Sequence, residues 1–167
     1  MELLQVIKSI ASQLQNLHSG VGYADIVLSV DNFSDRIIFP VVPANLPELE
    51  TPQANSNFEG VLVDLTVMGN IKCKQMSWDG LLPSSVSKYP FCRPLGDSAT
   101  RVISFIKQYQ AEFVPLRLTI TFTNGATYLN MLVLVNNFRY YRDNVGDYHY
   151  TIELVEYRDV NDSGVLL

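Results

Sequence analysis

The sequence has few charged residues. Asp, Glu, Lys and Arg make up 17% of its 167 residues, against roughly 25% in ordinary soluble domains. It also lacks a long apolar run: the longest uninterrupted aliphatic stretch is Met131–Val135, whereas a membrane-spanning helix needs about 20 apolar residues. A membrane span therefore cannot account for the shortage of charge. We expect it to reflect surface that is buried against other protein chains.

Basic clusters are also missing. The net charge is −5 and the pI is near 4.9, and a charge of that sign repels phosphate backbones. Lys72 and Lys74 are close together in the sequence, but no other basic residue lies near them, so contact with nucleic acid is not expected. The first residues lack the basic and apolar segments of a secretory signal, which favours a cytoplasmic site of synthesis. The two cysteines, Cys73 and Cys92, are too few for a disulfide scaffold, and we expect free, mostly buried thiols.

Patterns typical of catalysis or metal binding fail on inspection. The block Gly96-Asp97-Ser98-Ala99 is similar to the nucleophile block of some esterases, but Thr100 occupies the second glycine position of G-x-S-x-G. Ser98 is better interpreted as a capping-region residue of a helix. A calcium-type loop that begins at Asp159 would need its twelfth ligand beyond Leu167.

The possible zinc ligands lack the paired local spacing of zinc modules; they are His18, Cys73, Cys92 and His149. We therefore expect no catalytic residue, no metal site and no cofactor, and we interpret the protein as non-enzymatic.

The first half of the chain predicts one helix and several short strands. Residues 2–17 carry apolar side chains at helical spacing. The segment Pro40–Asn57 holds four prolines and is predicted to be a loop. The predicted strands are Tyr23–Val30, Arg36–Phe39, and a pair formed by Phe58–Val67 and Ile71–Trp78 around Gly69-Asn70, followed by an irregular loop over Asp79–Pro94.

The second half shows a clearer pattern. A helix over Ala99–Gln110 is predicted, capped by Asp97 and stopped by Pro115. Strict alternation over Leu116–Thr123 predicts a half-buried strand, and Asn124-Gly125 predicts a two-residue hairpin turn. The resulting register places three apolar pairs on one face, namely Ile120 with Leu129, Leu118 with Met131, and Leu116 with Val133.

A second hairpin is predicted to turn at Asp143–Asp147, with a return strand that alternates from Tyr148 to Val155. These elements predict an α+β fold, an antiparallel β-sandwich or barrel with one or two packed helices. The expected organisation is an N-terminal helix over residues 1–20, a single β-rich domain over 21–160 and a C-terminal tail over 161–167.

Leu132 and Leu134 lie on the second face of their strand, where the neighbouring strand offers Arg117. Either the N-terminal helix or a loop covers them, or they contact another subunit. We predict a protein interface that includes Leu132, Leu134, Asn124, Gly125, Pro43 and Pro47.

The order of motifs resembles a known family. The most specific block is Gly146-Asp147-Tyr148-His149-Tyr150-Thr151-Ile152-Glu153-Leu154 with Glu156-Tyr157-Arg158, and weaker ones are Phe39-Pro40-Val41-Val42-Pro43 and Gly69-Asn70-Ile71-Lys72. Across residues 37–160 the chain resembles baseplate and tail-hub proteins of contractile phages and phage-like particles, of the LysM-containing tail protein type.

This resemblance implies a structural role in a contractile injection system. Such proteins join the tail tube or central hub to surrounding baseplate (wedge) proteins, assemble as homo-oligomeric rings that are commonly sixfold, and have a tail-tube-like core. The implied location is the virion tail or baseplate, after assembly in the cytoplasm of the bacterial host. Many relatives carry a peptidoglycan-binding LysM module. Too few residues follow the last predicted strand to form one here, so we do not carry that activity over.

Two other classes stay open. A carbohydrate-binding or adaptor β-sandwich would need an exposed aromatic platform, for which Trp78, Tyr140 and Tyr141 are the candidates. An enzyme would need a cleft in which His149 meets carboxylates.

Overall fold

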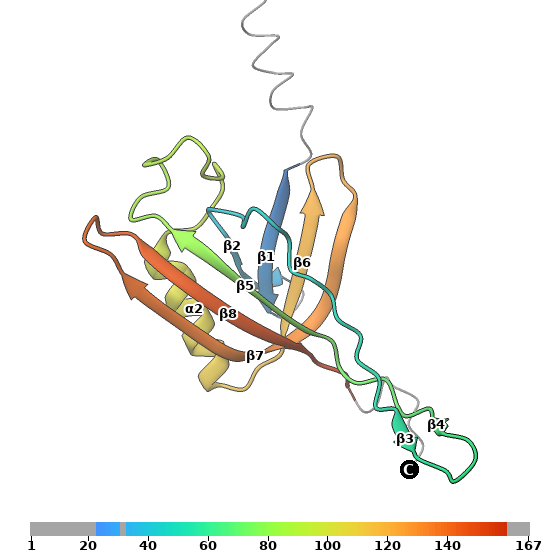
Figure 1. The fold of residues 1–167 in the computed structure, drawn as a ribbon. Helices are drawn as coiled ribbons and strands as arrows, with labels where there is room; N and C mark the ends of the chain where they lie inside the picture. Colours follow the sequence, from blue (N-terminus) through green and yellow to red (C-terminus); the bar gives the residue numbers. More distant parts are fainter. Residues whose placement is uncertain (1–22, 31–32, 160–167) are drawn as a thin grey trace, which may run out of the picture.

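A six-stranded antiparallel sheet, curled into a half-barrel, forms most of the molecule (Figure 1). The computed structural model describes residues 23–30 and 33–159. The order across the sheet is β2-β1-β6-β7-β8-β5, and β3 and β4 form a separate two-stranded sheet. The elements are β1 (Ala24–Val30), β2 (Asp35–Ile38), β3 (Ser56–Phe58), β4 (Leu65–Val67), β5 (Gln75–Leu82), α2 (Ala99–Ala111), β6 (Leu116–Phe122), β7 (Thr127–Arg142) and β8 (Tyr148–Glu156).

The predicted α+β class is confirmed, as a half-barrel with one packed helix among the described residues. The predicted N-terminal helix, the C-terminal tail and His18 lie outside those residues.

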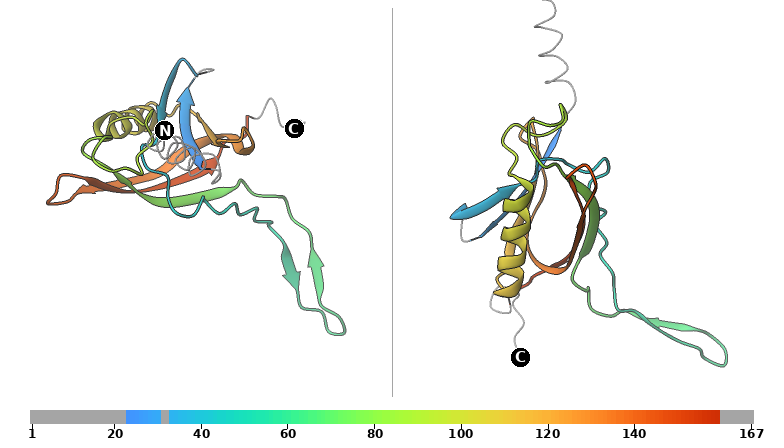
Figure 2. Two further views of the ribbon diagram at one scale, coloured as in Figure 1. Left: turned by 90° about the horizontal axis from the view of Figure 1, so that it is seen from above. Right: turned by 90° about the vertical axis from the view of Figure 1, so that its left-hand side faces the viewer.

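The long strand β7 gives the sheet its curvature. Its first half pairs with β6 up to Val133, and from Val133 onward it pairs with β8. Between Val135 and Asn137 the register shifts, so that Asn136 is an extra residue. Such a bulge bends its strand and increases the twist. The two halves of the sheet therefore curl around one core (Figure 2).

The concave face of the half-barrel carries the core. Leu116, Leu118 and Ile120 of β6 are fully buried, as are Ile26 and Leu28 of β1. The helix α2 adds a stripe of buried side chains to this core, Val102, Phe105 and Ile106. Their spacing of three and one residues places them on one face of the helix, as predicted. The loop after β2 packs Val42, Leu46 and Leu49 against the same core.

Three aromatic side chains fill one end of this core. The indole nitrogen Nε1 of Trp78 donates a hydrogen bond to Tyr150 Oη at 3.0 Å, and the Phe39 ring stacks on Tyr150 with 5.6 Å between centroids. Burial raises the pKa of the Tyr150 hydroxyl. Gly80 pairs with Tyr150 across the β5–β8 ladder, and a Cβ on Gly80 would lie 2.5 Å from the Tyr150 ring.

The start of α2 differs in detail from the prediction. Ser98 is the N-cap, and its hydroxyl accepts from Arg101 N at 3.4 Å, which confirms its assignment as a capping-region residue. Asp97 was predicted to cap the helix and does not. Its Oδ2 instead accepts from Ile38 N at 2.7 Å and its own N–H donates to Ile38 O at 2.9 Å, because the edge of β2 offers unpaired backbone groups there.

The predicted register of β6 and β7 is confirmed for all three apolar pairs, but the predicted two-residue turn is wrong. Phe122 N donates to Ala126 O at 2.8 Å, which leaves a three-residue loop, and Gly125 takes a φ of 85°. A type I turn followed by a left-handed residue is the usual three-residue solution. A register shift next to Ile120 then restores the apolar pairing.

The predicted pairing of Phe58–Val67 with Ile71–Trp78 is wrong. Within the first segment, β3 and β4 pair with each other across a turn at residues 59–64, and β5 pairs with β8. Gly69 is not at a turn, since its Cβ position lies 1.6 Å from Ala54 O on the facing leg. Because Gly69 has no side chain, the two legs of the hairpin can approach closely at this position. A glycine in the sequence is compatible with either a turn or such a close approach, so the sequence alone did not distinguish them.

The second hairpin turns at Asp143–Asp147, as predicted. Asp147 is buried, and its Oδ1 accepts from Lys88 Nζ at 2.7 Å and from Ser84 N at 2.8 Å. Its Oδ2 accepts from Tyr89 Oη at 2.6 Å. These hydrogen bonds, with that from Lys88 foremost, lower the pKa of the Asp147 carboxyl and fasten the loop after β5 to the β7–β8 turn.

We predict that Gly80→Ala destabilises the fold by about 1–3 kcal/mol, the usual cost of overpacking a core. The added methyl group has to displace the buried ring of Tyr150. Urea unfolding of both proteins measures the difference, with Ser77→Ala as the control at an exposed position of the same strand. Equal stability of Gly80→Ala and the wild type would contradict the packing described.

We also predict a pH-dependent effect of Asp147→Asn. Because the folded-state pKa of Asp147 is lowered, its contribution to stability is present above its ordinary pKa, about 4, and is lost as the pH falls toward the lower folded value. The variant should be less stable than the wild type at neutral pH, and the difference should shrink in acid. Unfolding free energies measured across this range test it, and Asp64→Asn, at an exposed carboxylate, should show no such trend.

Candidate interaction surface

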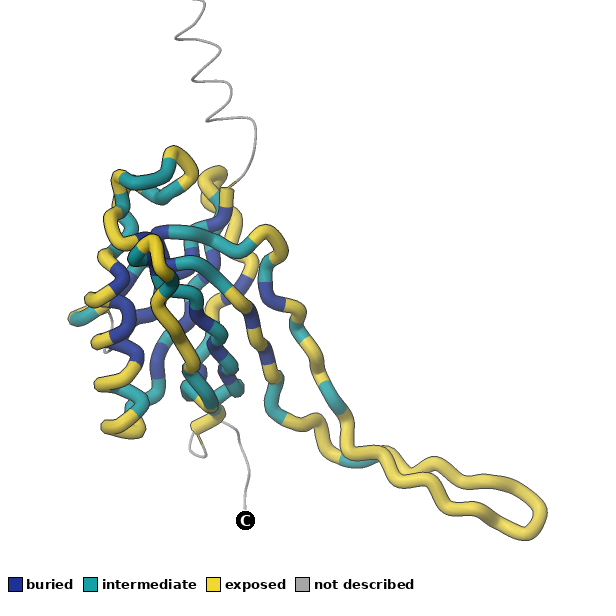
Figure 3. The backbone as a smooth tube through the Cα atoms, turned by 60° about the vertical axis from the view of Figure 1, so that its left-hand side comes forward, coloured by how far each residue is buried: buried dark blue, intermediate teal, exposed yellow. Residues whose placement is uncertain are grey.

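A long hairpin projects from one end of the half-barrel (Figures 1 and 3). We call residues 53–72 the projecting hairpin. Its legs are joined by the β3–β4 ladder, by a bridge between Gln53 and Ile71, and by the hydrogen bond from Ala54 N to Asn70 O at 3.0 Å. Every residue in it is exposed except Gly69, which is half-buried.

About half of the side chains of the projecting hairpin are apolar, and all of these are exposed. Its tip is the most exposed part, with Val61 102% and Leu62 95% accessible, and Met68 on the returning leg is 82% accessible. Exposed apolar clusters of this kind mark sites of contact with other molecules. Among the described residues, eight of the seventeen large apolar side chains that are exposed lie on this hairpin: Phe58, Val61, Leu62, Val63, Leu65, Val67, Met68 and Ile71.

The backbone of the projecting hairpin also has hydrogen-bonding groups without a ladder partner. Among the residues that the structure describes, the sheet formed by β3 and β4 has only two strands, so each strand has one edge without a ladder partner there. An isolated two-stranded hairpin is marginally stable in water, and open edges are templates for pairing with another chain. Both features mark the projecting hairpin as a candidate interaction surface.

The base of the projecting hairpin is fixed to the half-barrel. Arg158 donates to the backbone oxygens of Ile71 and Lys72, each at 3.3 Å, and to Glu156 Oε2 at 2.8 Å. Glu156 Oε2 also accepts from Lys74 N at 2.9 Å. The hydrogen bond from Arg158, followed by that from the Lys74 amide, lowers the pKa of the Glu156 carboxyl. This clamp holds the direction in which the hairpin leaves the sheet.

An apolar groove of about 660 Å³ lies at the other end of the half-barrel. Its walls come from the start of β1, the loop after β2, the loop before α2 and the end of β6. Arg93 is the one charged residue among those that line it, with Asp25 Oδ1 2.8 Å from its Nε. The lining residues include Tyr23, Val41, Val42, Pro43, Leu46, Phe91, Cys92 and Phe122.

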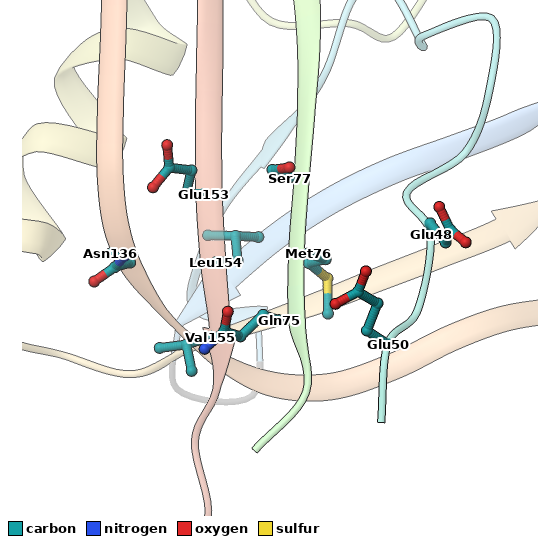
Figure 4. A pocket seen from close by; sticks show the side chains of 9 residues that line it. All are labelled: Glu48, Glu50, Gln75, Met76, Ser77, Asn136, Glu153, Leu154 and Val155. Carbon is teal, nitrogen blue, oxygen red and sulfur yellow. The ribbon is translucent and has the colours of Figure 1, made fainter. Parts of the chain in front are cut away.

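A second hollow, of about 420 Å³, lies between the lower part of β5 and β8 and the loop that leads into the projecting hairpin (Figure 4). Glu48 and Glu50 come from that loop, and Glu153 comes from β8. Its lining is therefore acidic, in contrast to the apolar groove.

A third hollow, of about 250 Å³, has a mixed polar and apolar lining that includes His149. The Nε2 of His149 lies 3.2 Å from Asp143 Oδ2, and its ring stacks on Tyr141 with 5.1 Å between centroids. The charged residues that line the hollow are Asp79 and Arg139; no serine, cysteine or lysine is among its described lining.

The structure separates the residues predicted from sequence to form an interface. Leu132 and Leu134 are half-buried on the convex face, and Asn124 and Gly125 are exposed at the β6–β7 turn.

Of the two predicted prolines, Pro43 lines the apolar groove, whereas Pro47 is buried and its carbonyl accepts from Tyr128 Oη at 3.2 Å. The sequence pattern did not predict the projecting hairpin as a surface. One signal could have indicated an apolar turn instead of a strand: Gly60 and Asp64, residue types common in turns, flank Val61-Leu62-Val63.

Scans of the sequence against protein-family models and against curated proteins found no match. In the part of the chain that the structure describes, no helix is long and apolar enough to cross a membrane, and no group of three metal-ligating side chains occurs. Cys73 and Cys92 are free and half-buried.

We predict that replacing the tip residues Val61, Leu62 and Val63 together by serine leaves folding stability nearly unchanged, within about 0.5 kcal/mol per substitution. These side chains are exposed, so their removal loses no packing. Urea unfolding measures the stability, and binding of a hydrophobic dye, which should fall, measures the exposed apolar surface.

Ile152→Ala, at a fully buried position, is the contrasting control and should cost about 2–5 kcal/mol. A comparable loss in the tip variant would show that the tip packs within its own chain, against the geometry described.

Proposed function

We propose that this protein is a non-enzymatic structural subunit of a contractile phage tail or phage-like particle. In this proposal it forms part of a homo-oligomeric ring in the baseplate, commonly sixfold, and joins the tail tube or central hub to surrounding baseplate proteins. Its place of action is the virion tail, after assembly in the bacterial cytoplasm. The observation that carries the proposal is the projecting hairpin, whose apolar side chains and open strand edges have no partner within the described chain.

The shortage of charge supports an assembly role. Interface cores are depleted in charged residues and enriched in aromatic ones. The projecting hairpin holds three charged residues in twenty, Glu59, Asp64 and Lys72, together with its eight exposed apolar side chains. A monomer that exposes this element would be poorly soluble, whereas a ring subunit would bury it.

The assignment to a phage tail or baseplate, as opposed to another assembly, rests on the sequence resemblance over residues 37–160. The fold is compatible with it, since a curled antiparallel sheet with one packed helix is the kind of core that the resemblance implies.

The carbohydrate-binding alternative finds less support. Trp78 is only 6% exposed and is hydrogen-bonded to Tyr150 in the core. Tyr140 and Tyr141 are consecutive residues of β7, so their side chains project from opposite faces of the sheet. These three residues therefore do not form one exposed aromatic platform.

We predict that the full chain assembles in solution and that the triple serine variant at Val61, Leu62 and Val63 does not. Light scattering coupled to size-exclusion chromatography measures the mass of each. The wild type should form a closed oligomer of defined mass, because a head-to-tail contact closes when its rotation divides a full turn. The matched control, Leu95→Ser with Val145→Ser, removes exposed apolar side chains outside the hairpin and should assemble like the wild type.

A wild-type chain that stays monomeric and is absent from purified particles would contradict the proposed function. Assembly of the triple serine variant with unchanged mass would contradict the role given to the hairpin. The identity of the flanking genes tests the phage context separately, since tube, sheath and tape-measure genes are expected beside this one.

A further inference from the structure

We propose that the tip of the projecting hairpin in one copy of this chain inserts into the apolar groove at the opposite end of a second copy. This inference rests on the proposed function and deepens it, because it names both sides of the subunit contact. The inserted side chains are those of Val61, Leu62 and Val63, and the receiving surface is built around Pro43, Phe91 and Phe122.

The two surfaces lie too far apart for the tip of one chain to enter the groove of the same chain. The groove is lined by Tyr23 at the start of β1 and by Phe122 at the end of β6, and both lie at one end of the half-barrel. The projecting hairpin leaves from the other end and points away from the body (Figures 1 and 3). The Arg158 clamp holds it there. A tip can therefore reach a groove only on another molecule.

The chemistry of the tip matches the groove. Three consecutive aliphatic side chains at the tip are flanked by Glu59 and Asp64, and neither carboxylate makes an ion pair with a described residue. The groove is mostly apolar, and Arg93 is the single cation among the described residues that line it. Arg93 uses Nε for Asp25 and Nη2 for Ala24 O, at 2.8 and 2.7 Å, so its Nη1 group keeps donors for a carboxylate of the tip.

The other two hollows are poor receivers for this tip. The hollow beside the hairpin base presents Glu48, Glu50 and Glu153, which would repel Glu59 and Asp64. The hollow at His149 is smaller, about 250 Å³, and the charged side chains Asp79 and Arg139 are part of its mixed lining. Burying aliphatic side chains is favourable where water is displaced from apolar surface. Of the three hollows, the apolar groove has the most apolar surface.

The contact has a definite symmetry. Each copy gives one tip and receives another, so the interface is head-to-tail and uses different surfaces on its two sides. Such heterologous contacts form rings when the rotation closes and filaments when it does not. The inferred contact is therefore the kind that a ring subunit needs.

The native Cys92 makes the contact directly testable. It lines the groove and is half-buried and free. We predict that Leu62→Cys in a Cys73→Ser background forms a disulfide with Cys92 of the next copy under mild oxidation. Because each chain then has two different cysteines at a head-to-tail contact, a non-reducing gel should show a ladder beyond dimers. Mass spectrometry should identify the peptide pair.

Two controls define the result. Adding Cys92→Ser leaves one cysteine per chain, so products larger than dimers should fall at least tenfold. Val145→Cys in the Cys73→Ser background places a cysteine at another exposed apolar position, 64% accessible, and should give no ladder. A ladder that does not depend on Cys92, or an equal ladder from Val145→Cys, would overturn the inference.

The remaining outcomes separate this inference from the proposed function. If the wild type assembles but Cys92 forms a cross-link only with a cysteine placed in residues 1–22, such as Leu14→Cys, then the groove binds the N-terminal segment. The tip-in-groove contact is then wrong, while the proposed function stands. If the wild type is monomeric by light scattering at the same concentration, both fail.

Discussion

Strand β7 is the constraint on which the rest of the structure depends. Its sixteen residues pair with β6 at one end and with β8 at the other, and the extra residue Asn136 bends it between the two. This bend brings β1 and β2 over the same core as β8 and β5. The apolar side chains of all six strands and of α2 then fill one concave face.

The residues that stabilise the half-barrel are separate from the exposed apolar residues of the projecting hairpin. Leu118, Ile152 and Phe105 are buried within the half-barrel, and Asp147 fastens the loop after β5 to the β7–β8 turn. The projecting hairpin contributes no side chain to that core and leaves eight apolar side chains in solvent. The residues that stabilise the fold are therefore different from those that form the exposed apolar surface. Such a division is useful in a subunit that has to fold before it assembles.

The sequence predicts those features that local periodicity determines. The alternation of Leu116, Leu118 and Ile120 gave their buried face and their partners on β7 correctly, even though the turn at Gly125 has three residues. The pairing of β5 with β8 joins residues 66 to 80 positions apart, and no local pattern indicates it.

The projecting hairpin was missed for a related reason. A run such as Val61-Leu62-Val63 has the composition of a buried strand, and its place at a solvent-exposed turn follows from the close approach of the two legs at Gly69. Of the residues predicted to form an interface, Pro43 lies in the apolar groove whereas Pro47 is buried. Surface position was thus predicted less well than strand identity, because exposure depends on which segments pack over a residue.

The central claim is that the projecting hairpin is completed by another chain, and backbone hydrogen exchange tests it most directly. In a dilute monomer the amides of β3 and β4 should exchange rapidly, because a two-stranded hairpin opens readily. At concentrations where the chain associates, the same amides should become protected, while amides of β6 and β8 remain protected throughout. Rapid exchange of β3 and β4 in the assembled state would contradict the account.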